Sequence, residues 1–117
     1  MDKTGNEILD ITFEFAIAII EFADLLEQNK KFVIANQILK SGTSIGANIR
    51  EAQNAESKSD FIHKMKIAAK EAEETEYWLL LCQHSINYPD TTSLQNSLLS
   101  IKKILTKIIS SSKKSIN

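Results

Sequence analysis

The chain has 117 residues, a length that fits one domain with its own core and leaves little room for a second. With one proline and three glycines, it disfavours an all-β fold, which needs many tight turns. The formal net charge of −1 excludes a global basic field that would draw the whole molecule to nucleic acid.

The first predicted helix covers residues 5–28. Its apolar residues recur at three- and four-residue steps, which is typical of one stripe of a helix. The stripe consists of Ile8, Ile11, Phe15, Ala18, Phe22 and Leu25, widened by Ile19 and Leu26. Thr4 and Glu7 have the spacing of a capping box, so we expect the helix to start near Thr4.

The second predicted helix covers residues 32–54. Its apolar face consists of Val33, Ile34, Ile38, Ile45 and Ile49. The middle of this helix is built almost entirely of small residues, among them Gly42 and Gly46. Because a glycine inside a helix costs about 1 kcal/mol relative to alanine, two glycines four residues apart need a reason. Either a neighbouring helix approaches closely there, or the helix is kinked.

The third predicted helix covers residues 58–87. Ser57 with Asp60, or Ser59, provides its start signal. Pro89 marks its end, because proline lacks an amide hydrogen and restricts the residue before it. Its apolar stripe consists of Phe61, Met65, Ala68, Ala69, Ala72, Thr75, Leu79 and Cys82.

The fourth predicted helix covers residues 92–112. Thr92 and Gln95 have the spacing of a second capping box. Its apolar stripe consists of Leu94, Leu98, Ile101, Leu105 and Ile108. Residues 110–117 are polar, and we expect them to fray.

Four amphipathic helices joined by three short links have one economical arrangement. Each helix packs antiparallel to the previous one, and all apolar stripes face a common core. The sequence therefore predicts an all-α fold, an antiparallel up-and-down four-helix bundle, in a single domain over residues 1–117.

The sequence contains no recognisable combination of a nucleophile, a general base and an orienting residue, the three groups that nucleophilic catalysis needs. Cys82 lies on the third apolar stripe, where a thiol behaves as a small hydrophobe, so we expect no enzyme activity and no cofactor. As the single cysteine it forms no intrachain disulfide, which fits the reducing cytoplasm. The longest apolar run, residues 15–20, is too short to span a bilayer. We therefore expect a cytoplasmic protein without a membrane partner.

Asp60 and His63 raise a rival hypothesis, a small metal-binding enzyme. Di-iron bundles combine carboxylates with a Glu-x-x-His unit on each of two helices. Asp60 and His63 have that spacing, with aspartate in place of glutamate, and no second unit occurs in the sequence. Further carboxylates follow on the same helix at Glu71, Glu73, Glu74 and Glu76. The ligand count disfavours a metal site, and a solvated helical face is the alternative for the glutamates.

Charge is distributed unevenly along the chain. Residues 1–28 carry seven acidic side chains and one lysine, whereas residues 90–117 carry five lysines and one aspartate. On the last helix, Lys103 and Lys107 lie on nearly one face, with Lys102 beside them. These lysines form either a solvated face that pairs with an acidic helix or a strip that contacts phosphate groups.

A motif in the second helix carries a family resemblance. Residues 37–51 read QILKSGTSIGANIRE. This segment resembles the 23S rRNA intervening-sequence proteins, whose second helix has a pattern like Q-I-x-R-A-A-x-S-I-P-A-N-I-A-E-G. Matching residues are Gln37, Ser44, Ile45, Ala47, Asn48, Ile49 and Glu51, followed by Ser59-Asp60-Phe61, Ile67-Ala68, Glu74, Glu76 and Tyr88. Gly46 stands where the family often has proline, and Lys40 replaces an arginine, which loses bidentate geometry.

The resemblance implies an up-and-down bundle that assembles as a cyclic homopentamer. Coding sequences of this family occur in insertions within large ribosomal RNA genes. Related proteins serve as accessory variability determinants of diversity-generating retroelements, where a basic pentamer binds nucleic acid and the reverse transcriptase. Because this chain has a net charge of −1, nucleic-acid binding carries over only weakly.

The second helix also supplies most of the candidate site. Asn48 and Glu51 either join a buried polar network that fixes the register of the helices or face a subunit interface or a ligand. The candidate network or interface comprises Lys40, Ser44, Asn48, Glu51, Glu74 and Glu76. The candidate nucleic-acid contacts are Lys40, Arg50, Lys102, Lys103 and Lys107.

These observations predict a non-enzymatic homo-oligomeric bundle, expected to form a pentamer, that acts as a nucleic-acid-binding accessory protein or as a scaffold. Two alternatives remain open at this point. One is a module that binds only other proteins. The other is the metal-binding enzyme that uses Asp60, His63 and the carboxylates of the third helix.

Overall fold

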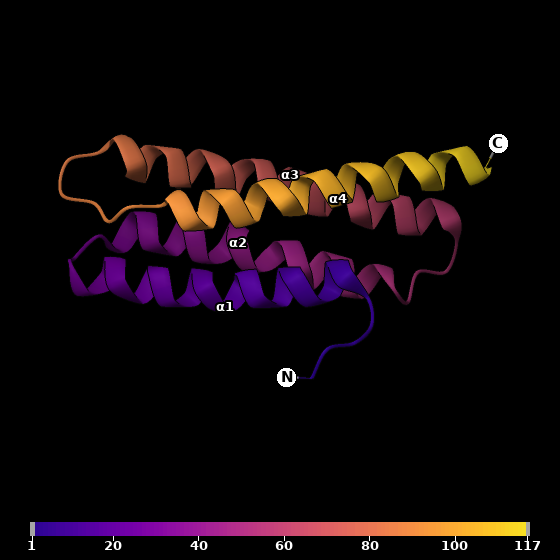
Figure 1. The fold of residues 1–117 in the computed structure, drawn as a ribbon, viewed down its shortest axis with the longest axis horizontal. Coiled ribbons are helices and arrows are strands. Elements are labelled where there is room, and N and C mark those ends of the chain that lie inside the picture. The colour runs from indigo at the N-terminus through magenta and orange to yellow at the C-terminus, as the bar shows by residue number, and fades with distance from the viewer. Residues whose placement is uncertain (1, 117) are drawn as a thin grey trace.

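The computed structural model describes the backbone of residues 2–116 and the side chains of residues 2–114. This part of the chain forms four helices and no strand: α1 (Glu7–Gln28), α2 (Phe32–Ala52), α3 (Lys58–His84) and α4 (Thr92–Ile116). Each helix runs antiparallel to the one before, and α4 returns beside α1 to close the bundle (Figure 1). The bundle measures 50 × 28 × 21 Å. The predicted four-helix bundle is therefore confirmed.

One face of every helix fills a continuous apolar core along the long axis of the bundle. Burial of each large aliphatic side chain in such a core contributes about 1.5–3 kcal/mol to stability. The largest fully buried apolar side chains are Ile19, Leu26, Ile38, Ile45, Ile49, Met65, Leu79, Leu98, Ile101 and Leu105. All four predicted apolar stripes contribute to this core.

The core face of α1 is rotated relative to the predicted stripe. Ile19 and Leu26, predicted at the edge of the stripe, are fully buried, whereas Leu25 is 41% exposed. Ile11 and Ala18 are only half-buried. The rotation arises because α1 packs closely on α2 and more loosely on α4. The side of α1 that faces α4 consequently remains partly open to solvent.

The predicted apolar face of α2 is wrong at its first position. Val33 is 80% exposed, and Ala35 occupies the core instead. Residues two apart on a helix point about 200° away from each other, so Ala35 and Ile38 can face the core only if Val33 points outward. The remaining predicted isoleucines lie in the core or against it.

The start of α1 differs from the predicted capping box. Glu7 is the first helical residue, and Asn6 precedes it without a side-chain cap. The amide and the hydroxyl of Thr4 both donate to Oδ1 of Asp10, each at 2.9 Å. The predicted capping box between Thr4 and Glu7 is therefore wrong. The turn at Gly5, which has a φ of 83°, places Thr4 beside the first helical turn rather than at its end.

Two helices end earlier than predicted. α2 ends at Ala52, two residues before the predicted position. α3 ends at His84, because Ser85 adopts an extended conformation and its hydroxyl donates to the Leu81 carbonyl at 2.6 Å. Asn87 follows with a φ of 67°, a left-handed conformation that asparagine tolerates. The predicted end at residue 87, inferred from Pro89, is therefore three residues too late.

The start of α4 at Thr92 is confirmed, but its cap is not the predicted one. The side-chain amide of Gln95 donates to the hydroxyl of Thr91 at 2.6 Å rather than to Thr92. The Thr91 amide donates to Oε1 of Gln83 at 2.7 Å, which ties the link between the helices to the end of α3. α4 continues to Ile116 instead of fraying from residue 110, since lysines in its last turn complement the helix dipole.

The two glycines of α2 allow α1 to approach its backbone. A Cβ atom at Gly42 would lie 2.8 Å from Cγ1 and Cγ2 of Ile19. At Gly46 the nearest atom would be Oγ1 of Thr12, at 3.3 Å. α2 is one unbroken helix through both positions. Of the two predicted reasons for these glycines, close approach of a neighbouring helix is the correct one.

We expect Gly42→Ala to lower the free energy of unfolding by about 1–3 kcal/mol, because the new Cβ overlaps a fully buried isoleucine. The better helix propensity of alanine offsets at most about 1 kcal/mol of this loss. Gly46→Ala is the matched control, since it has the same propensity gain and milder crowding. Urea unfolding measures both, and an equal loss in the two variants would contradict the packing argument.

Candidate functional site

The polar residues predicted on α2 lie along the side of this helix that faces α3. The Ser44 hydroxyl donates to the Lys40 carbonyl at 2.6 Å, and Nδ2 of Asn48 donates to the Ser44 carbonyl at 2.8 Å. Both side chains are half-buried. Their hydrogen-bonding groups are satisfied within α2, a local pattern to which serine and asparagine are well suited.

Charged residues of α3 flank this strip. Oε2 of Glu51 lies 4.0 Å from Nζ of Lys64. The pKa of Glu71 is raised, mainly because its carboxyl is partly buried and also because the negative charge of Glu74 is close by. The positive charge of Lys40 partly offsets this rise. The outer seam between α2 and α3 therefore brings Lys40, Glu51 and Glu74 to one side of the bundle. The sixth predicted residue, Glu76, lies on the other side of α3.

A buried polar contact joins α2 and α3 beneath this seam. The hydroxyls of Ser41 and Thr75 lie 3.0 Å apart, and both residues are fully buried. Thr75 also donates to the Glu71 carbonyl at 2.7 Å. Sequence reasoning placed Thr75 on the apolar stripe without assigning it a partner. The signal was present, since a hydroxyl on a core-facing stripe needs a hydrogen bond.

Lys102 is held between two carboxylates of α3. Its Nζ lies 2.9 Å from Oε1 of Glu73 and 3.1 Å from Oε2 of Glu76. The hydrogen bond to Glu73, helped by that to Glu76, raises the pKa of Lys102. Lys103 and Lys107 are exposed, and neither makes an ion pair with another described residue. The predicted basic strip thus contains two unpaired cations and one that stabilises the α3–α4 contact.

Arg50 lies at a shallow depression between α1 and α2. The depression has a volume of about 140 Å³. Phe13 and Ala16 of α1 and Gly46 and Ala47 of α2 contribute to its lining. Arg50 is exposed at its edge, about 100–120° around α2 from Ser44 and Glu51. The predicted nucleic-acid contacts therefore do not form one continuous patch.

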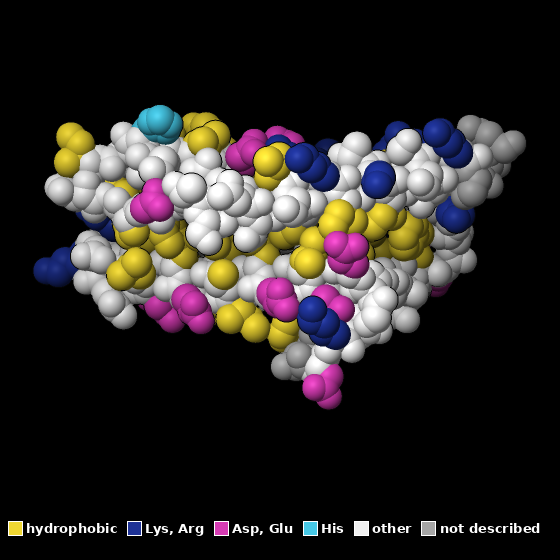
Figure 2. Space-filling model, viewed as in Figure 1, with side chains coloured by type: hydrophobic (Ala, Val, Ile, Leu, Met, Phe, Trp, Pro, Cys, Tyr) yellow, Lys and Arg dark blue, Asp and Glu magenta, His cyan; other side chains and the backbone are white. Residues whose placement is uncertain are grey.

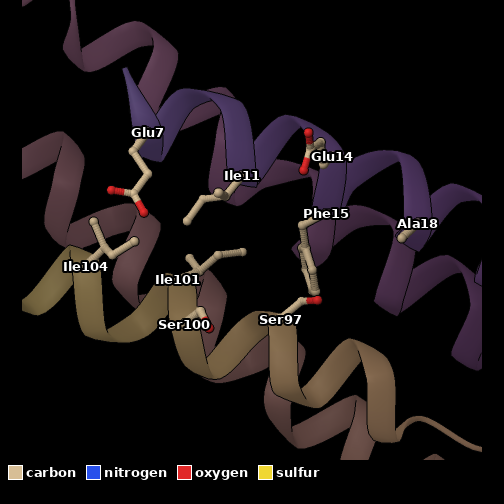
Figure 3. A pocket seen from close by; sticks show the side chains of 9 residues that line it. All are labelled: Glu7, Ile11, Glu14, Phe15, Ala18, Ser97, Ser100, Ile101 and Ile104. Atoms are coloured by element: carbon tan, nitrogen blue, oxygen red, sulfur yellow. The ribbon is translucent and has the colours of Figure 1, made fainter. Parts of the chain in front are cut away.

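A longer groove runs between α1 and α4, the seam that is packed most loosely. Figure 2 shows apolar side chains along this seam, with carboxylates along α1 and lysines gathered toward the C-terminal half of α4. The groove has a volume of about 380 Å³. Its lining residues, shown in Figure 3, are Glu7, Ile11, Glu14, Phe15, Ala18, Ser97, Ser100, Ile101 and Ile104. It combines an apolar floor with an acidic wall.

The residues of the rival metal hypothesis are used differently. Ser57 caps α3 by accepting the Asp60 amide at 3.0 Å, and Oδ2 of Asp60 accepts the Glu56 amide at 3.3 Å. The predicted start signal at Ser57 is therefore confirmed. His63 is exposed. Across residues 2–114, no three His, Cys, Asp or Glu side chains come close enough together to hold a metal ion.

Comparisons with known proteins agree with this architecture. The family model of the 23S rRNA-intervening sequence protein matches residues 5–110. The chain belongs to this family. A crystal structure of a protein with unknown function from the S23 ribosomal protein family of Bacteroides thetaiotaomicron VPI-5482 is similar, with 47% identity and a TM-score of 0.83. The match covers 87% of this chain and 97% of that protein.

The family resemblance stated from residues 37–51 is thus confirmed. No curated protein matches the chain. Within the described residues, none of the helices is long and apolar enough to cross a membrane. The description of the family names no activity, and the similar crystal structure is of a protein with unknown function, so function has to be argued from the surfaces of the bundle.

The buried thiol of Cys82 makes a testable contribution to stability. Burial raises the pKa of Cys82 to about 11, whereas a cysteine in an unfolded chain titrates near pH 8.5. Because the pKa of the thiol is higher in the folded state, the neutral thiol contributes its full stabilisation of the fold below about pH 8.5. This stabilisation is lost as the pH rises toward 11.

We therefore expect the free energy of unfolding to fall by up to about 1.4 kcal/mol per pH unit in that window, and Cys82→Ala to remove this part of the slope. Urea unfolding at pH 8, 9 and 10 compares the two proteins. The same pH slope in both would contradict the assignment to Cys82.

Proposed function

We propose that this family member is a non-enzymatic, cytoplasmic scaffold that works as a homo-oligomer, a ring of five copies. The observation that carries the proposal is an apolar row on the outer side of α1. Ile17 and Ile20 are each 45% exposed there, and Phe13 beside them is half-buried. Contiguous exposed apolar surface of this kind is typical of protein–protein contacts.

The neighbouring surface of α2 supports close packing by another copy. Gly46 and Ala47 line the shallow depression next to Phe13, so the surface there has little side-chain bulk. Small residues let a second backbone approach closely, just as Gly42 does inside the bundle. Ala47 also belongs to the motif that matches the family. The face formed by α1 and α2 is therefore proposed as one of the two surfaces that meet where neighbouring copies join in the ring.

Native mass spectrometry and light scattering test the proposed ring. Five chains of 13.1 kDa give a particle of about 66 kDa. We expect the double variant Ile17→Lys, Ile20→Lys to shift the protein to a monomer while its helical circular dichroism is kept, because both side chains are already exposed in the single chain.

Ile86→Lys is a control for an exposed isoleucine elsewhere, since Ile86 is 86% exposed in the link between α3 and α4. This variant should keep the mass of the unmodified protein. A clean monomer of the unmodified protein at micromolar concentration would overturn the proposal. Disruption by the Ile86 variant but not by the α1 variants would place the contact elsewhere.

A second function, contact with nucleic acid, is favoured by the lysines of α3 and α4. Lys103 and Lys107 are exposed, and the charge of Lys113 lowers the pKa of Lys66 on the adjacent helix. Neighbouring cations that are not paired with carboxylates repel one another, and a bound anion such as a phosphate relieves this repulsion. A ring would repeat this basic surface once per subunit, so that several weak contacts to one nucleic acid act together.

We expect Lys103→Gln together with Lys107→Gln to weaken RNA binding and to reduce the slope of log affinity against log salt by about one to two, since each lost phosphate contact removes about 0.7–0.9. Fluorescence titrations with a single-stranded RNA at 50 and 200 mM salt measure both effects. Lys30→Gln, at the link between α1 and α2, is a control that removes one positive charge away from this surface. Salt-independent binding, or equal loss in the control, would contradict a specific basic surface.

A further inference from the structure

We propose that the groove between α1 and α4 binds a basic amphipathic helix of a partner protein. The groove does not include the apolar residues proposed to join copies of this chain, because neither Ile17 nor Ile20 lines it. The inference therefore does not depend on the oligomeric state.

An apolar row at helical spacing forms the floor of the groove. Ile11, Ala18 and Leu25 follow one another at seven-residue intervals on α1, so they lie on one side of the helix. Ile11 and Ala18 line the groove, and Leu25, 41% exposed, continues the row beyond it. The row extends over 14 residues, about 21 Å of helix at 1.5 Å per residue. A helical segment of about four turns matches this length.

The groove is open because small side chains form its other wall. Ser97 and Ser100 of α4 face the apolar row, whereas Ile101 and Ile104 supply the depth (Figure 3). Figure 3 also shows Ile11 and Phe15 projecting from α1 toward α4 with space between them. A leucine or isoleucine of a docked helix would fill this space, since apolar anchors in pockets carry most of the energy of such contacts.

The charge beside the groove selects the partner. Glu7, Glu14 and Glu21 repeat at the same seven-residue interval next to the apolar row. None of the three makes an ion pair with another described residue. α1 as a whole carries six acidic residues and no basic one. Apolar positions flanked by one row of charge are the pattern by which paired helices choose a partner of opposite charge.

This charge pattern argues against three other occupants. Nucleic acid and an anionic membrane surface would be repelled by the row of carboxylates. Two-fold docking of a second copy, groove against groove, would bring two acidic rows together. A helix with leucine or isoleucine every three to four residues and lysine or arginine along one flank meets both the apolar floor and the acidic wall.

The probe is a synthetic two-heptad peptide, about four turns long, with leucine at both core positions, lysine along one flank, and alanine and glutamine elsewhere. Fluorescence anisotropy of the labelled peptide measures its affinity for the full chain. A peptide with glutamate in place of lysine tests charge, and one with serine in place of leucine tests the apolar floor. We expect both replacements to weaken binding at least tenfold.

A charge exchange gives the decisive test. The triple variant Glu7→Lys, Glu14→Lys, Glu21→Lys should lose about tenfold or more affinity for the lysine peptide, since each exposed pair contributes about two- to fivefold. The same variant should gain affinity for the glutamate peptide by a similar factor. Such a reciprocal exchange cannot arise from partial unfolding, which would weaken both peptides.

Filling the groove provides an independent test. Ser100→Trp places a large side chain against the apolar row and should abolish binding of the lysine peptide. Ser110→Trp, at an exposed position of α4 that does not line the groove, should leave binding unchanged. The proposal fails if the lysine peptide does not bind, or if binding survives Ser100→Trp. It also fails if Glu7→Lys, a change in the groove far along α1 from Ile17 and Ile20, alters the native mass of the chain, because the groove would then join copies.

Discussion

The packing of Ile19 onto the bare backbone of Gly42 sets the geometry of this bundle. With 2.8 Å between the Ile19 side chain and the place where a Cβ would lie, no other residue type fits at Gly42 without movement of the core. The contact draws α1 toward α2 and turns Ile19 and Leu26 into the core. In the same rotation, Ile11, Ala18 and Leu25 are left partly open on the side of α4.

Close packing at one seam and loose packing at another therefore have a common origin. A helix has a limited width of apolar surface, so a face that is rotated toward one neighbour is withdrawn from the opposite neighbour. The serines of α4, Ser97 and Ser100, leave the space unfilled where larger side chains would have closed it. The two exposed apolar regions of α1 thus lie on either side of its core face, whose side chains are already packed within the bundle.

The charges divide into those used within the bundle and those left for other molecules. Lys102 pairs with Glu73 and Glu76, Lys64 lies near Glu51, and Nζ of Lys31 lies 4.8 Å from the centre of the Tyr88 ring. The carboxylates of α1 and the lysines at the far end of α4 have no such internal use among the described ion pairs. A chain with a net charge of −1 can therefore present an acidic groove and a basic end at once.

The amino-acid sequence by itself determined the fold class, the family and the approximate helices, because apolar periodicity and the cap at Ser57 act locally. It also identified Gly42 and Gly46 as positions that need a close neighbour. Only the tertiary structure decided which side of each helix faces which neighbour. The rotation of α1, the pairing of Lys102 with α3 and the contact of Ser41 with Thr75 all follow from distances between helices, and sequence spacing within one helix does not contain those distances.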